Sequence, residues 1–226
     1  MVSTTSEPSS RRKYDNSRRR ADAEARQRRI VVAATDLFLE QGFGATSIDQ
    51  IADAADVSAP TVYAIFGSKA GVLARAIDVA VAGDYDDTPV IDRALTFVDK
   101  FGNQPLQQSA AVAHFIRTAN ERVAPLDRVM EQAASTDPAI QEMRTGLMAA
   151  IRADCTKAVE QSWRTALRPG MPESEAADVM AMMLSPFVFS MLTADLGWSP
   201  ERYQRWIADA LPKLLFDDQN PDSTGR

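Results

Sequence analysis

The chain has 226 residues, of which 45% are apolar, so it can form one large domain or two smaller ones around a real core. A single cysteine, Cys155, excludes an intrachain disulfide and fits a reducing compartment. No apolar leader segment opens the sequence, and no run approaches ~20 uninterrupted apolar residues. We therefore expect a soluble, cytoplasmic protein with no membrane contact.

The net charge of −6 conceals an asymmetry along the chain. Residues 1–30 carry nine bases against four acids, a net charge of +5, whereas the remaining residues carry a net charge of −11. A cationic head on an acidic body favours a polyanionic partner at the N-terminal end alone, because nucleic acid would repel the body. A solvated basic tail without a partner is the alternative that composition leaves open.

Helical periodicity dominates the pattern from about Ser17 onward. The polar, basic residues 1–20 are predicted to form a flexible arm. Apolar residues at spacings of three and four then predict a helix that ends at Gly42, where a positive φ is needed. Ser47 and Gln50 have the form of a capping box, which predicts a second, short helix.

A third helix is predicted to begin near Ala59, with Pro60 in its first turn, where a missing N–H matters little. Asp56 lies in the tight turn before it and tolerates the left-handed conformation better than most residues do. A fourth helix is predicted to follow Ser68, which caps it, and to run to about Gly83.

The remainder of the chain predicts six further helices and no strand. Their approximate ranges are 89–101, 106–121, 124–135, 138–167, 173–196 and 200–216. Proline- and glycine-containing breakers separate them, and Pro186 is expected to kink the helix that contains it. The predicted class is therefore all-α, with a disordered tail at 217–226.

Two short helices joined by a tight turn, behind a longer helix, form a helix-turn-helix unit. In such a unit the second short helix offers its N-terminal residues to the major groove of DNA. The polar side of the unit carries hydroxyl groups and one lysine, beside helix N-termini. These are the groups that bind a phosphate backbone.

Residues 28–77, which contain this helix-turn-helix unit, resemble the DNA-binding domain of the tetracycline-repressor (TetR) family of bacterial regulators. The matching residues are Ala33-Ala34, Leu37-Phe38, Gly42-Phe43, Thr46-Ser47-Ile48, Ile51-Ala52, Ala55, Val57-Ser58, Thr61-Val62-Tyr63, Phe66, Ser68-Lys69 and Leu73. The resemblance implies a helical homodimer whose subunits each have a DNA-binding domain with a linking helix, placed at 21–83. A C-terminal ligand-binding and dimerisation domain would occupy 84–216.

The resemblance also implies two groups of DNA contacts: phosphate contacts from Ser47, Thr61, Tyr63 and Lys69, and base-edge contacts from Ala59, Pro60 and Ala64. Ala64-Ile65 replaces the aromatic–histidine pair common in the family, which leaves this helix without Arg, Asn, Gln or Lys for bidentate base reading. Specificity would then depend on methyl contacts, DNA shape and the arginine arm entering a minor groove. Plain attraction of the arm to phosphates is the alternative.

Eight of the nine methionines lie between Met130 and Met191. Flexible thioethers suit an adaptable apolar pocket, but they also suit core or subunit packing. The candidate ligand contacts are Phe97, Phe101, His114, Phe115, Met143, Leu147, Met183 and Phe187. His114 is the only histidine and lacks a partner at a recognisable spacing, so neither a metal site, a cofactor nor a catalytic centre is predicted.

Segments 173–196 and 200–216 carry apolar residues on more than one side, which indicates a four-helix interface with a second copy. The expected function is a DNA-binding transcription regulator and not an enzyme. The resemblance implies a repressor that a small apolar effector releases from a palindromic operator. The alternative is a helical small-molecule-binding or interaction protein that binds no operator.

Overall fold

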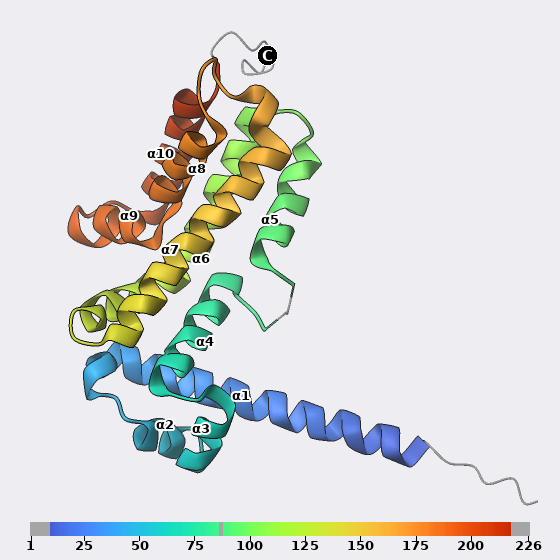
Figure 1. The fold of residues 1–226 in the computed structure, drawn as a ribbon, viewed down its shortest axis with the longest axis vertical. Helices are drawn as coiled ribbons and strands as arrows, with labels where there is room; N and C mark the ends of the chain where they lie inside the picture. Colours follow the sequence, from blue (N-terminus) through green and yellow to red (C-terminus); the bar gives the residue numbers. More distant parts are fainter. Residues whose placement is uncertain (1–9, 86–87, 218–226) are drawn as a thin grey trace, which may run out of the picture. The chain divides into compact units, whose positions relative to one another are not determined.

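The computed structural model describes residues 10–85 and 88–217 (Figure 1). These residues are helical almost throughout, and the one β-type pairing among them is an isolated bridge between Leu167 and Phe216. The predicted all-α class is confirmed. The chain forms two compact units, Met1–Leu73 and Ala74–Arg226, so the division falls inside a helix and not at the predicted boundary after residue 83.

The first unit is the predicted three-helix head. It contains α1 (Ser10–Ala45), α2 (Ile48–Ala54), α3 (Ala59–Phe66) and the first residues of α4 (Lys69–Ala82). Its core consists of apolar residues from every one of these helices, among them Ile30, Phe38, Ile51, Val62 and Val72. The apolar stripes predicted from spacing therefore face one another in the head.

Local backbone features of the head are confirmed. Gly42 has a φ of 79°, which breaks the helical path of α1, and Asp56 has a φ of 53° in the turn before α3. The side chain of Ser47 accepts a hydrogen bond from the Gln50 amide, and the Gln50 side chain accepts one from the Ser47 amide. The capping box is thus complete, and it starts α2 where the pattern predicted.

The basic N-terminal segment differs from the prediction of a flexible arm. Residues 1–9 lie outside the described part of the chain, but residues 10–20 are helical and continuous with α1. Arginine and lysine, which make up more than half of residues 10–20, are good helix formers, and a segment that extends an existing helix avoids the unfavourable nucleation step. The predicted tail after Asp217 lies outside the described residues.

The second unit contains the rest of α4, followed by α5 (Val90–Val98), α6 (Pro105–Ala134), α7 (Pro138–Ala158), α8 (Glu173–Leu184), α9 (Pro186–Ser190) and α10 (Pro200–Leu215). Short 3-10 or π turns, Asp99–Phe101, Val159–Trp163, Arg164–Ala166 and Met191–Asp195, follow α5, α7 and α9. Helix α6 packs against α5, α7, α9 and α10 and is therefore the central helix of this unit (Figure 1).

Two prolines behave differently from their predicted effects. Helix α6 continues through Pro125, because the residues on both sides of it are buried in the core and their packing outweighs one missing hydrogen bond. At Pro186 the chain is interrupted and not merely kinked. Ser185 leaves the helical conformation with a ψ of 147°, ends α8, and caps α9 by accepting a hydrogen bond from the Val188 amide.

The segment Glu173–Asp195 is long and apolar enough to pass a length and hydropathy test for a membrane span, although polar and charged residues interrupt it and no run of ~20 apolar residues occurs in it. Within its most apolar window 61% of the residues are buried inside the protein. The interruption at Ser185 also divides the segment into two helices. Both features are those of a core segment of the second unit.

Gly71→Ala is expected to destabilise the head, because a Cβ at this position would lie 2.1 Å from the carbonyl oxygen of Phe66. That oxygen belongs to the backbone, so the clash can be relieved only by moving α3 or α4. We expect the free energy of unfolding, measured by urea denaturation, to fall by about 1–3 kcal/mol. Gly44→Ala is the matched control, since a Cβ there meets nothing within 4 Å. Equal stability of the two variants would contradict this packing.

Candidate nucleic-acid interface and apolar cavity

Helix α3 leaves one face open. Pro60 and Ala64 are exposed and Ala59 is partly buried, whereas Val62 on the opposite side is fully buried. The side chain of Tyr63 has an exposed fraction of 53%, which is high for an aromatic residue. The predicted base-edge residues therefore lie together on an accessible helix face.

Two of the predicted phosphate contacts are hydroxyls held beside helix N-termini. The Ser47 hydroxyl accepts a bond of 3.1 Å from the Gln50 amide, and its own hydrogen can still be donated to another acceptor. The Thr61 and Ser58 hydroxyl oxygens lie 2.8 Å apart and share one hydrogen bond. Both hydroxyls are thus oriented by local bonds at the kind of position that binds phosphate.

Lys69 has a structural role that the sequence pattern did not reveal. Its Nζ donates to the carbonyl oxygens of Phe43, at 2.6 Å, and Thr46, at 2.7 Å, and lies 4.2 Å from the centre of the Phe43 ring. These contacts join the start of α4 to the turn between α1 and α2. A phosphate contact from Lys69 would have to be made beside these bonds or in exchange for them.

Exposed arginines extend along the N-terminal part of α1. Arg18, Arg19 and Arg20 are all exposed, and Arg20 forms an ion pair of 2.9 Å with Glu24. A helix is ~10–12 Å across, whereas the minor groove of B-DNA is ~6 Å wide. The helix itself is too wide to enter a minor groove, so only its arginine side chains could do so, whereas attraction to phosphates needs no such entry.

The second unit contains an apolar cavity of about 210 Å³. Helices α5, α6, α7 and α8 supply most of its lining, and Val81 of α4 also contributes. Polar side chains are few among the lining residues: Asn120, Asp154, Cys155, Ser162 and Trp163. A partly open cavity of this composition suits a small, mainly apolar molecule.

Only two of the eight predicted ligand contacts, Phe115 and Leu147, line this cavity. The other six lie elsewhere: Phe97, Phe101, His114, Met143, Met183 and Phe187. His114 and Phe187 are exposed, and Met183 is packed in the core. The prediction favoured large aromatic and thioether side chains, whereas alanine, valine, leucine and isoleucine supply most of the lining because small side chains leave the space open.

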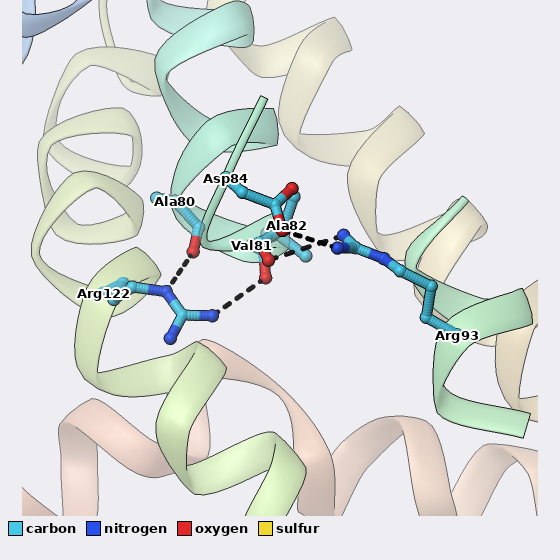
Figure 2. Close-up of polar contacts among 6 residues, drawn as sticks. All are labelled: Ala80, Val81, Ala82, Asp84, Arg93 and Arg122. Carbon is cyan, nitrogen blue, oxygen red and sulfur yellow. Dashed lines mark hydrogen bonds and ion pairs between the residues drawn. The ribbon is translucent and has the colours of Figure 1, made fainter. Parts of the chain in front are cut away.

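Arg122 of α6 holds the C-terminal end of α4 (Figure 2). Its Nε donates to the Ala80 carbonyl at 2.8 Å and its Nη2 donates to the Val81 carbonyl at 3.2 Å. The last carbonyls of a helix lack intrahelical partners and carry partial negative charge, so a guanidinium satisfies them well. Gly83 permits this approach, since a Cβ there would lie 2.9 Å from the Arg122 guanidinium carbon.

Arg93 of α5 holds the same end of α4 from another helix (Figure 2). It donates to the Ala82 carbonyl at 3.4 Å and pairs with the Asp84 carboxylate at 2.7 Å. We call Arg93 and Arg122 the arginine clamp. The residues next to them in sequence, Ala94 and Val123, line the cavity. Neither arginine was predicted to have a role, because nothing in the local pattern distinguishes these two residues from solvated charges.

An ion pair also ties α5 to α7 beside the cavity. Lys157 Nζ lies 2.6 Å from Asp92 Oδ1. Burial raises the pKa of Asp154, and the neighbouring Asp92 adds to the rise while Lys157 opposes it. The lining residue Asp154 therefore belongs to a small charged group at the α5–α7 side of the cavity.

Cys155 offers a direct test of the cavity. Burial raises the pKa of its thiol to about 12, so the reactive thiolate is scarcer at every pH below that value than for a free cysteine with a pKa of about 8.5. At pH 8 we expect iodoacetamide to alkylate the folded protein about a thousandfold more slowly than the urea-unfolded protein. The rate in the folded state should still rise about tenfold per pH unit between 8 and 10. A plateau near pH 9 would contradict a buried, apolar environment.

Comparison with known proteins places the head in a family of regulators. Residues 30–76 match the model described as bacterial regulatory proteins, tetR family. The chain is 37% identical over 68 residues to the HTH-type transcriptional activator FasR of Mycolicibacterium smegmatis, covering 28% of this chain and 31% of FasR. It is 35% identical over 68 residues to the HTH-type transcriptional repressor BdcR of Escherichia coli, covering 26% of this chain and 34% of BdcR. The matches thus span about a third of each relative.

Solved structures resemble the chain over most of its length. NalD, the secondary repressor of the MexAB-OprM multidrug efflux pump in Pseudomonas aeruginosa, has a TM-score of 0.66 at 20% identity over 88% of this chain and 99% of its own. SmeT, in its complex with triclosan, has a TM-score of 0.65 at 18% identity over 86% of this chain and 93% of its own. At these identities the likeness establishes the fold.

Proposed function

We propose that the chain is a transcription regulator of the TetR type, which responds to a ligand and binds an operator as a homodimer. The proposal is supported by the match of residues 30–76 to the tetR family of bacterial regulatory proteins and by the fold that the chain shares with NalD. The observation that carries the proposal is the accessible face of α3. It bears Pro60, Tyr63 and Ala64, and it lies within the residues that match the family. The relatives include an activator and a repressor, and we favour repression.

In the proposed complex α3 enters the major groove. The hydroxyls of Ser47, Thr61 and Tyr63 donate to phosphates and set the register, whereas the base edges meet the small apolar groups of Ala59, Pro60 and Ala64. Lys69 holds the turn that carries Ser47 and so supports the phosphate contacts. The exposed arginines of α1 add sequence-independent attraction.

A homodimer is supported by apolar side chains left uncovered on the C-terminal helices. Met182 and Leu196 have exposed fractions of 57% and 63%, and Phe187 and Leu214 are also exposed. Exposed apolar residues grouped on neighbouring elements mark interfaces, and a twofold pair of heads matches two half-sites of a palindrome. A chromosomal operator places the regulator in the cytoplasm, which agrees with a single unpaired cysteine.

The cavity is the proposed site of a small apolar effector. Its apolar lining supports this, as does the complex of SmeT with triclosan, since SmeT shares the fold. The arginine clamp gives the effector a route to the head. A molecule that displaces α5 or α6 also displaces the guanidinium groups bonded to α4, and α4 continues into the first unit. The effector then favours a conformation that binds the operator less well.

An electrophoretic shift assay with DNA from upstream of the chain's own gene tests the function. We expect a specific complex that weakens steeply as salt rises, because phosphate contacts dominate affinity. Tyr63→Phe should weaken this complex about threefold to tenfold through loss of one phosphate bond, and should weaken binding to scrambled DNA equally. The alternative, a small-molecule-binding or interaction protein, predicts no specific, salt-sensitive complex. Unchanged affinity in Tyr63→Phe would remove that residue from the interface.

Arg122→Gln tests the clamp. The change removes the cation and its two bonds to α4 carbonyls, so backbone amides in residues 79–85 should exchange with deuterium at least about tenfold faster. Arg128→Gln is the matched control, because Arg128 lies on the same helix and pairs with Asp195 instead of α4. If both variants exchange at the wild-type rate in this segment, the clamp does not hold α4.

A further inference from the structure

We propose that Asn120 is the polar anchor of the cavity, and that the effector is an uncharged, mainly apolar molecule that donates one hydrogen bond to it, as a phenolic hydroxyl does. The inference deepens the proposed effector-binding function and depends on it. It follows from how the amide of Asn120 is held and from what else lines the cavity.

The orientation of the Asn120 amide is set by its nitrogen. Asn120 is only 1% exposed and lines the cavity from α6. Its Nδ2 donates to the Leu184 carbonyl at 3.1 Å and to the Tyr203 hydroxyl oxygen at 3.4 Å. Tyr203 in turn donates to the Met183 carbonyl at 3.0 Å, so the tyrosine hydroxyl can only accept from Asn120. Both donors of the amide are therefore turned toward the end of α8 and toward α10.

The acceptor atom of the same amide, Oδ1, has no hydrogen-bond partner among the described residues, unlike Nδ2. Capping the last carbonyls of α8 explains the position of Nδ2. Oδ1 accepts no hydrogen bond from the described residues, and it is not fully buried, so it keeps some open surface in a residue that lines the cavity. An amide oxygen is a strong acceptor, and leaving it unpaired in an apolar cavity is unfavourable. A ligand that donates to Oδ1 removes this penalty, whereas a ligand with only acceptors does not.

The other polar groups of the cavity do not select for a donor. The Ser162 hydroxyl also lacks a partner, but it can rotate and either donate or accept. The Trp163 indole nitrogen is already bonded to Gln108 Oε1 at 2.8 Å. Cys155 carries a neutral thiol, which is a weak partner in either direction. Asn120 is therefore the group that discriminates between ligands.

The charge of the lining residues and the volume of the cavity restrict the class of ligand further. No lysine or arginine occurs among the described lining residues, and the one carboxylate is that of Asp154, so an anionic ligand would meet repulsion and no counter-ion. A volume of about 210 Å³ exceeds the ~150 Å³ of an apolar cavity that holds benzene. The space suits one aromatic ring with a short alkyl chain.

Calorimetric titration of the full chain, without DNA, with 4-propylphenol and 4-propylanisole tests the proposal. The two probes differ by one methyl group. It replaces the hydroxyl hydrogen of the phenol, so the ether oxygen can accept a hydrogen bond but cannot donate one. We expect the phenol to bind about threefold to tenfold more tightly, and the anion 4-propylbenzoate to bind at least about tenfold more weakly than the phenol. Equal binding of phenol and ether, or no binding of either, would overturn the proposal.

Variants then assign the preference to one residue. Asn120→Leu should bind the phenol and the ether equally, while Ser162→Ala and Asp154→Asn should retain the wild-type preference. If Asn120→Leu does not fold, the other two variants still decide, because loss of the preference in either would place the anchor elsewhere and overturn the assignment. The absence of DNA separates this outcome from the proposed function: a protein that shifts its operator but shows no phenol preference would refute only the anchor.

Discussion

Helix α4 is held at both ends by cationic side chains bonded to backbone carbonyls, and the proposed response depends on these bonds. At its start the ammonium of Lys69 joins the carbonyls of Phe43 and Thr46. At its end the guanidinium groups of Arg93 and Arg122 bond to the last carbonyls of the helix. Charge-assisted bonds of this kind are stronger than neutral ones and fix direction as well as distance. A lysine at a helix N-terminus opposes the helix dipole, so its position there is explained by the carbonyls it reaches.

The same helix spans the division between the two units. Val72 and Leu73 belong to the first unit, Ala76 and Ile77 belong to the second, and all four side chains are buried. Small side chains create the cavity in the second unit, and one residue of α4, Val81, belongs to its lining. Helix α4 therefore contributes directly to the cavity lining, which is the contact that the proposed response requires.

The head could be predicted from the sequence almost completely, because its signals are local. The positive φ of Gly42, the capping box of Ser47 and the left-handed Asp56 each depend on residues within a few positions. The cavity could not be predicted in this way. Its lining comes from six helices and the π turn after α7, and the clamp joins Arg122 to carbonyls more than forty positions earlier. Long-range packing also allows α6 to continue through Pro125, although a proline normally interrupts a helix. The sequence indicates that Lys69 lies at the start of a helix, but not that its ammonium joins the carbonyls of Phe43 and Thr46.

Thermodynamic linkage between the cavity and DNA is the central claim about this protein. The measurement is the dissociation constant for the upstream DNA fragment at fixed salt, with and without saturating 4-propylphenol. The account predicts that the ligand raises this constant at least about fivefold, the range of ordinary allosteric coupling, and that the DNA weakens ligand binding by the same factor. An operator affinity that is unchanged by a ligand shown to occupy the cavity would contradict it.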